Sequence, residues 1–192
     1  MKVELLQATP NPEIFIGQMA GICYGKENSD DETCIKRAAH CVEKGHLSTL
    51  RFAHATFRVS GISRVCSHQL VRSKHLDFLQ RSQRYCNEGA ANIVVPDSIK
   101  SDDFYTENIV HNAVSQCFKA YDKLIDAGVK KEDARMILPQ CTTTELIVVG
   151  NFQAWLDFIN LRNTKEAQWE IRAVAQEIKV QLSSIAPNVF KS

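Results

Sequence analysis

The sequence predicts an α/β protein of the α+β type, because strand-like and helix-like segments both occur along its 192 residues. Strand-like segments rich in β-branched residues are Thr49–Ser60 and Thr142–Val149. The clearest helix has apolar side chains at intervals of four residues, at Ile109, Ala113, Cys117, Tyr121 and Ile125. With 44% hydrophobic residues the chain can bury a core, so we expect one domain over residues 1–192.

The first part of the chain predicts a strand followed by two helices. Val3–Gln7 is a short strand-like segment, and the prolines of Thr9–Glu13 favour a helix that starts there and reaches about Tyr24. A second helix is expected over Asp31–Lys44, since acidic residues suit its N-terminus and Gly45 suits its end.

After the Thr49–Ser60 strand, Ser63–Val71 predicts a helix, and polar residues around Pro96 predict a loop from Asn87 to Tyr105. The long helix ends at Gly128, and the charged run Lys130–Asp133 is interpreted as a solvated turn. Beyond the Thr142–Val149 strand, two amphipathic helices close the chain, at Phe152–Leu161 and Lys165–Ile185.

Composition narrows the class of protein. The net charge of +1 and the pI near 7.6 give no basic field that would indicate a nucleic-acid partner. No apolar run approaches the roughly 18 residues of a membrane span, and the N-terminus lacks the apolar core of a signal peptide. The seven cysteines are scattered without a C-x-x-C pair, which favours reduced thiols, a cytoplasmic location and no metal site.

Residues 69–85 concentrate groups that bind anions around a serine. The basic and hydroxyl side chains of this segment are Arg72, Lys74, His75, Arg81, Ser82 and Arg84. Guanidinium and ammonium groups are the usual partners of phosphate in proteins. The segment therefore predicts an anion site.

Three arginines lie among apolar residues, namely Arg84, Arg135 and Arg162. A guanidinium keeps its charge, so each of them needs an anionic or carbonyl partner. One reading is an internal salt bridge to a nearby acid, for which the candidates are Glu132, Asp157, Glu166 and Glu170. The other is a nucleotide monophosphate, whose phosphate and base carbonyls would serve all three arginines.

In order and spacing, a set of short motifs resembles the flavin-dependent thymidylate synthases, the family often called ThyX. The motifs are TPNPE near the start, Gly45-His46-Leu47-Ser48, FRVSGISRVCSHQLVR at 57–72, QRSQRY at 80–85, GVKKEDARMILP at 128–139, TTTEL at 142–146, NLR at 160–162 and AQWEIR at 167–172. The resemblance covers almost the whole chain. It implies a ThyX-like fold, a central antiparallel or mixed sheet flanked by helices, and a homotetramer with shared sites.

The resemblance also implies a reaction, in which deoxyuridine monophosphate (dUMP) is methylated to thymidylate. Methylenetetrahydrofolate would give the carbon, and flavin adenine dinucleotide (FAD) reduced by NADPH would give the hydride. Two alternatives stay open: a ThyX-like pyrimidine nucleotide hydroxymethylase or other one-carbon transferase with less need of flavin, and a catalytically weak nucleotide-binding homologue.

Position by position, the nucleotide side of the family site is nearly complete. The resemblance assigns catalytic roles to Arg84, Arg162 and Ser82, and it assigns dUMP binding to these three together with Arg64, Gln80, Gln83 and Arg135. Arg84 and Arg162 would hold uracil carbonyl oxygens. Ser82 would orient the substrate with Arg64 and Arg135 on the phosphate.

The flavin side departs further from the family. Cofactor contacts are expected from Ser48, Gln69, Arg72, Lys74, His75 and Asp157. The Arg-His-Arg signature triplet reads Arg72-Ser73-Lys74, although seven residues still separate it from Ser82. Other family residues are replaced by Arg51, Phe52, Gln153 and Asp157, so the resemblance does not decide whether flavin is bound.

Overall fold

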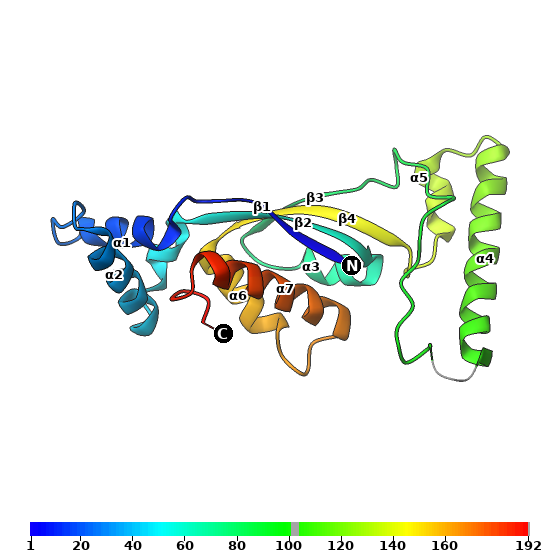
Figure 1. Ribbon diagram of the computed structural model, residues 1–192. Coiled ribbons are helices and arrows are strands. Elements are labelled where there is room, and N and C mark those ends of the chain that lie inside the picture. The colour runs from blue at the N-terminus through cyan, green and yellow to red at the C-terminus, as the bar shows by residue number, and fades with distance from the viewer. Residues whose placement is uncertain (101–103, 192) are drawn as a thin grey trace. The chain divides into compact units, whose positions relative to one another are not determined.

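A computed structural model describes residues 1–100 and 104–191. Four strands form one antiparallel sheet in the order β1-β2-β4-β3 (Figure 1). Their bounds are β1 Lys2–Ala8, β2 His54–Ser63, β3 Leu76–Gln80 and β4 Thr143–Asn151. The predicted α+β class with an antiparallel sheet and helices is therefore confirmed.

The chain divides into two compact units, and β2 and β4 each contribute residues to both. Unit 1 comprises Met1, Ser60–His68 and Gln80–Leu146, and unit 2 comprises Lys2–Val59, Gln69–Leu79 and Ile147–Ser192.

Helices α1 (Pro12–Ile22) and α2 (Asp31–Glu43) of unit 2 pack closely against each other. A Cβ atom on Gly17 of α1 would lie only 2.0 Å from the Cys34 carbonyl oxygen, so this approach requires glycine. The Asp30 side chain caps α2 by accepting from the Thr33 N–H at 2.9 Å, and this hydrogen bond lowers the pKa of Asp30. Both predicted helices are thus present, with ends one or two residues earlier than expected.

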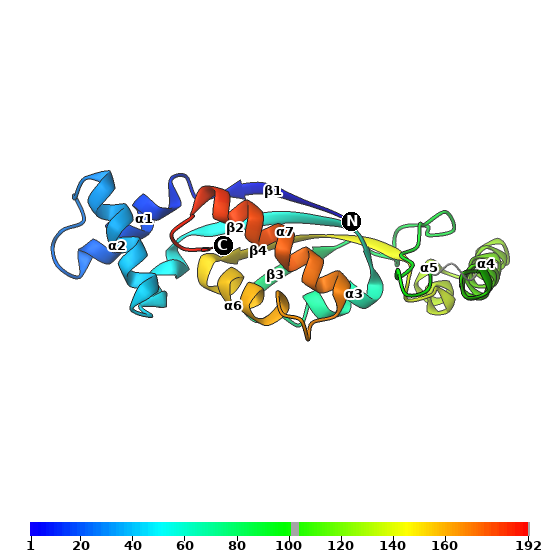
Figure 2. The same ribbon diagram turned by 60° about the horizontal axis from the view of Figure 1, so that its bottom comes forward.

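Two C-terminal helices of unit 2, α6 (Phe152–Arg162) and α7 (Trp169–Ile185), lie side by side (Figures 1 and 2). Buried rings of α6 join Phe57 of β2 in an aromatic core. The Trp155 ring meets Phe57 edge-on at 5.0 Å between centroids, and its Nε1–H donates to the Ala55 carbonyl at 3.1 Å. Burial of these rings is what anchors α6.

Unit 1 contains most of α3 (Arg64–Leu70), whose last two residues belong to unit 2. It also contains the long helix α4 (Phe104–Asp126) and the short helix α5 (Lys131–Ala134). A 3-10 helix, η2 (Arg135–Ile137), follows α5 directly. Tyr121 of α4 is fully buried, and its hydroxyl oxygen accepts from the Glu88 N–H at 3.4 Å. This contact links α4 to the loop that follows β3.

Two predicted elements need correction, and one strand was not predicted. Residues 47–52 form a 3-10 helix, η1 (Leu47–Phe52), so the strand expected from Thr49 begins only at His54. The last helix begins at Trp169 rather than Lys165, because Gln168 accepts from the N–H groups of the first turn and caps it there. Strand β3 was not predicted, and part of the loop expected between residues 87 and 105 lies outside the described residues.

Among the described residues, no helix combines the length and the apolar character that crossing a bilayer would require.

The Trp155 contacts predict that Trp155→Phe lowers the free energy of unfolding by about 1–3 kcal/mol, because the Ala55 carbonyl loses its donor and the smaller ring leaves a void. Equilibrium urea unfolding measures this change. Val180→Ala on the exposed face of α7 is the matched control and should stay within about 0.5 kcal/mol. Equal losses in both variants would contradict the anchoring role of Trp155.

Candidate functional site

Three of the predicted nucleotide-binding residues line one cleft of unit 1. Arg64 stands at the start of α3, Gln83 follows β3, and Arg135 begins η2. The cleft has a volume of about 330 Å³, and its remaining lining residues are His68, Met136, Leu138, Pro139 and Gln140. Residues distant in sequence are thereby brought to one concave surface.

The electrostatics of this cleft are those of an anion site. Burial first, and then the positive charge of Arg135, lower the pKa of Arg64, while Glu88 acts in the opposite direction. Two guanidinium groups that repel each other are stabilised when an anion lies between them. The cleft can therefore bind a phosphate or carboxylate.

A buried carboxylate organises the loop beside the cleft. Glu88 is 4% exposed and pairs with Arg81, whose Nε lies 3.1 Å from Glu88 Oε1. Glu88 also raises the pKa of Arg81, chiefly by its negative charge. Because Arg81 and Glu88 lie seven residues apart, this ion pair closes the loop that carries Ser82, Gln83 and Arg84.

The start of the same loop is fixed by neutral hydrogen bonds. The Gln80 side-chain amide donates to Ser67 Oγ at 3.0 Å and to Thr144 Oγ1 at 3.2 Å. The Arg81 N–H donates to the Glu145 carbonyl at 3.0 Å. Gln80, predicted to bind dUMP, thus connects α3 to β4.

Ser82 serves as the hydrogen-bond acceptor of the turn that follows. Its Oγ accepts from the Arg84 N–H at 3.2 Å, and its carbonyl accepts from the Cys86 N–H at 2.9 Å. These bonds orient the backbone of Gln83 and Arg84. No described histidine is hydrogen-bonded to Ser82 Oγ, so the geometry fits an orienting residue rather than an activated nucleophile.

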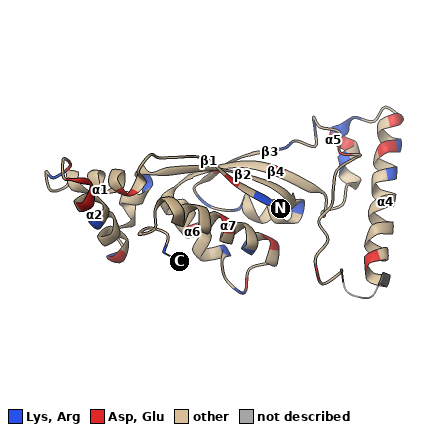
Figure 3. Ribbon diagram, in the orientation of Figure 1, with Lys and Arg blue, Asp and Glu red and all other residues tan. Residues whose placement is uncertain are grey.

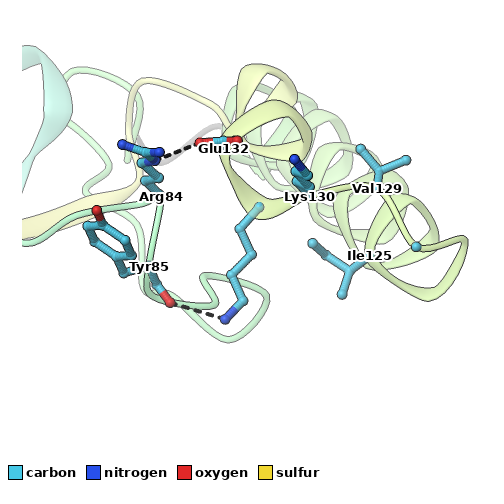
Figure 4. A pocket seen from close by; sticks show the side chains of 8 residues that line it. Arg84, Tyr85, Ile125, Val129, Lys130 and Glu132 are labelled. Carbon is cyan, nitrogen blue, oxygen red and sulfur yellow. Dashed lines mark hydrogen bonds and ion pairs between the residues drawn. The ribbon is translucent and has the colours of Figure 1, made fainter.

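Arg84 has an acidic partner in this structure. Its Nε lies 2.6 Å from Glu132 Oε2, and its guanidinium stands 5.5 Å from the centre of the Tyr85 ring (Figure 4). The salt-bridge reading of the sequence is therefore the observed one for Arg84. With side-chain exposures of 57% for Arg84 and 33% for Glu132, such a pair contributes at most about 1 kcal/mol, so a ligand can replace it.

Glu132 also contacts the second arginine of the trio. Its backbone carbonyl accepts from Arg135 Nε at 3.0 Å. One residue at the start of α5 therefore orients both Arg84 and Arg135.

The charged run before Arg135 is more than a solvated turn, contrary to the sequence interpretation. Lys131–Ala134 form the short helix α5, and Lys131 Nζ donates to the Tyr85 carbonyl at 3.1 Å. Figure 3 shows basic and acidic residues gathered on α5 and the nearby end of α4. This contact was missed because local sequence does not reveal a partner 46 residues away.

In unit 2, Arg162 at the end of α6 has an unsatisfied donor. Its Nε is buried without a hydrogen-bond partner, and its Nη2 makes only a long contact of 3.5 Å with the Gln69 carbonyl. A buried guanidinium N–H normally finds an acceptor. None of the acids considered for Arg162 forms an ion pair with it among the described residues, so its charge has no acidic partner there.

The signature triplet holds another such atom. The Ser73 hydroxyl is buried without a partner, whereas Arg72 and Lys74 on either side are exposed. His75, the next residue, adopts a left-handed backbone with φ of 61° before β3 begins. An unsatisfied hydroxyl between two exposed cations fits the edge of a polar, anionic ligand.

Of the other residues expected at the flavin, Ser48 on η1 and Asp157 on α6 are exposed, and Gln69 on α3 is half-buried. Arg51 Nε donates to Gln153 Oε1 at 2.7 Å. Gln153 and Asp157 are one helical turn apart on α6, so Arg51 places a positive charge near the face that carries Asp157. The described residues contain no group of three His, Cys, Asp or Glu side chains suited to a metal ion.

Comparison with known proteins identifies the family. The model of the family described as thymidylate synthase complementing protein matches residues 4–188. The chain belongs to this family, the flavin-dependent thymidylate synthases.

Among the relatives named "flavin-dependent thymidylate synthase" are the following three. The chain is similar to the protein of Geobacter sulfurreducens, with 36% identity over 200 residues that cover 100% of this chain and 86% of the relative. The protein of Mycobacteroides abscessus is 34% identical over 191 residues, covering 92% and 76%. That of Clostridium tetani is 32% identical over 214 residues, covering 100% and 86%.

Sequence reasoning missed two residues that organise the candidate site, Glu88 and Lys131. Glu88 lies outside the motifs of the resemblance, and Lys131 lies in the motif at 128–139 but was not assigned a ligand contact. The only signal for Glu88 was an acid seven residues after Arg81 in a loop, and burial is what gives it importance.

The buried Glu88 carboxylate predicts that Glu88→Gln lowers the free energy of unfolding by about 1–3 kcal/mol, because Arg81 loses its charged partner. Chemical denaturation measures the change. Asp97→Asn is the matched control, since Asp97 forms an ion pair with Lys100 but is 94% exposed, and it should have an effect below about 0.5 kcal/mol. If the two substitutions had the same effect, Glu88 would be an ordinary surface acid.

Proposed function

We propose that the protein is a flavin-dependent thymidylate synthase that converts dUMP to thymidylate, with methylenetetrahydrofolate as carbon donor and NADPH-reduced FAD as hydride donor. The observation that carries this proposal is the cleft in which Arg64 faces Arg135, in a chain that belongs to this family. The names of the relatives do not favour the hydroxymethylase or the binding-only alternative.

On the nucleotide side, Arg64 and Arg135 would bind the phosphate, with Ser82 and Gln83 orienting it. Two guanidinium groups bind a phosphate dianion with charge-assisted hydrogen bonds, which are about twice as strong as neutral ones. Gln80, which already connects α3 to β4, would support the loop that carries Ser82 and Gln83.

Arg84 and Arg162 would bind the carbonyl oxygens of the uracil ring. Positive charge at these oxygens stabilises the electron density that builds up as the C5 carbon becomes nucleophilic. Arg162 has a donor without an acceptor, which supports this role directly. Arg84 would exchange its Glu132 partner for the base.

The residues expected at FAD include groups that fit such a ligand. Arg72 and Lys74 would neutralise its phosphates, and the unsatisfied Ser73 hydroxyl would gain a partner. Ser48, Gln69, His75 and Asp157 would complete the contacts, and Arg51, which donates to Gln153 one helical turn from Asp157, would offset the charge of Asp157. Reduced flavin supplies the hydride that completes the methyl group. We further propose that residues 1–192 act as a single ThyX-like domain and that the enzyme is a homotetramer.

The unsatisfied Nε predicts that Arg162→Ala raises the Kd for dUMP roughly 10- to 100-fold, because a hydrogen bond to a charged group is worth about 1.5–3 kcal/mol. Isothermal titration calorimetry measures the Kd. Arg172→Ala is the matched control, since Arg172 lies on α7 and donates to the Lys165 carbonyl. Unchanged affinity of the Arg162 variant would show that the uracil contact is misplaced.

Because Arg72, Ser73 and Lys74 fit the phosphates of FAD, we predict that the purified protein shows the absorbance bands of oxidised flavin. The bands should be present either as isolated or after FAD is added and the excess is removed. Failure to retain FAD would rule out the proposed cofactor. If FAD is retained, release of tritium from C5-labelled dUMP, dependent on both NADPH and methylenetetrahydrofolate, tests the reaction itself.

A further inference from the structure

The start of α5 holds the Arg84 turn at two consecutive points. Lys131 Nζ donates to the Tyr85 carbonyl at 3.1 Å, and Glu132 Oε2 accepts from Arg84 Nε at 2.6 Å (Figure 4). Consecutive residues of one segment thus bind consecutive residues of another. We call these two bonds the α5 contacts.

The two α5 contacts constrain different parts of the turn. The Glu132 contact restrains the Arg84 side chain, and this bond must break when Arg84 binds a ligand. The Lys131 contact restrains the backbone carbonyl next to Arg84, and it can persist while the side chain moves. Of the two α5 contacts, only the Lys131 bond can therefore persist in both states, and it adds to the Ser82 bonds that orient the backbone of Arg84.

Both contacts border a cavity of about 480 Å³, whose further lining residues are Ile125, Gly128, Val129 and Lys130. Lys130 and Lys131 carry the same charge at neighbouring positions, but they differ in their contacts. Within the described part of the chain, Lys130 Nζ has no hydrogen bond or ion pair, and its side chain is exposed, whereas Lys131 is half-buried. Comparing Lys130 with Lys131 therefore separates the effect of a positive charge alone from that of a positive charge bonded to the Tyr85 carbonyl.

We propose that Lys131 is a positioning residue for Arg84, which it orients by fixing the Tyr85 carbonyl. The proposal rests on the proposed function, in which Arg84 contacts the uracil. An ammonium donor on a main-chain carbonyl restricts the backbone dihedral angles on both sides of that peptide. A turn held in its binding geometry before the ligand arrives loses less conformational entropy on binding.

The experiment compares Lys131→Met, Lys130→Met and Lys131→Arg in the full chain. Hydrogen–deuterium exchange of residues 82–88 reports on the turn itself, where the Tyr85 and Cys86 N–H groups donate to the Ser82 carbonyl at 3.2 and 2.9 Å. Titration with dUMP then reports on the consequence for binding. Both methionine variants remove one positive charge and keep a similar side-chain length.

In Lys131→Met we expect faster exchange of these amides than in the parent protein and a rise of about 3- to 10-fold in the Kd for dUMP. Exchange elsewhere in the chain should stay unchanged. Lys130→Met should match the parent protein in both measurements, and Lys131→Arg should restore most of the affinity.

Three results would overturn the proposal. Unchanged exchange in Lys131→Met would show that the bond to the Tyr85 carbonyl does not hold the turn. Equal losses of affinity in both methionine variants would show that Lys131 acts only through its positive charge. Faster exchange with unchanged dUMP affinity would make Lys131 a structural residue only. Failure of the parent protein to bind dUMP is a distinct outcome, because it would overturn the proposed function while the exchange data still showed whether Lys131 fixes the turn.

Discussion

The charge arrangement of unit 1 depends on the buried carboxylate of Glu88. A carboxylate that is 4% exposed is stable only when cations surround it, and Arg81 and Arg64 provide them. Glu88 in turn stabilises the positive charge of Arg64, which the neighbouring positive charge of Arg135 disfavours. Glu88 therefore allows several guanidinium groups to gather without a ligand. The loop between Arg81 and Glu88 takes its shape from this compensation.

Much of the fold follows from periodicity, because the long helices and the strands β2 and β4 have clear apolar patterns. In β4 buried and half-buried residues alternate along its whole length, which is the pattern expected of a strand with one covered face. Strand β3 is different. It has five residues, lies at the edge of the sheet and carries Asp77 and Gln80 among its apolar side chains, so local pattern does not separate it from the basic segment around it.

The candidate site was predictable in its residue types and less so in their contacts. The arginines were identified because a guanidinium in apolar surroundings needs a partner, but sequence left four acids as candidates. Arg84 pairs with Glu132 because the fold brings together two residues that are 48 positions apart in the sequence. Arg162 has no acid beside it among the described residues because of the way α6 packs. Such pairings are tertiary properties, and only the folded chain specifies them.

The backbone at His75 shows that one residue of the basic segment is costly for the fold. At φ of 61°, glycine would be free of steric conflict, whereas a residue with a Cβ atom costs about 1 kcal/mol or more in this conformation. Leu76, the following residue, is buried, so the turn that precedes it is set by the need to direct that side chain into unit 2. The fold would accept glycine at position 75 with a gain in unfolding free energy. The imidazole is thus an addition that the backbone geometry does not require.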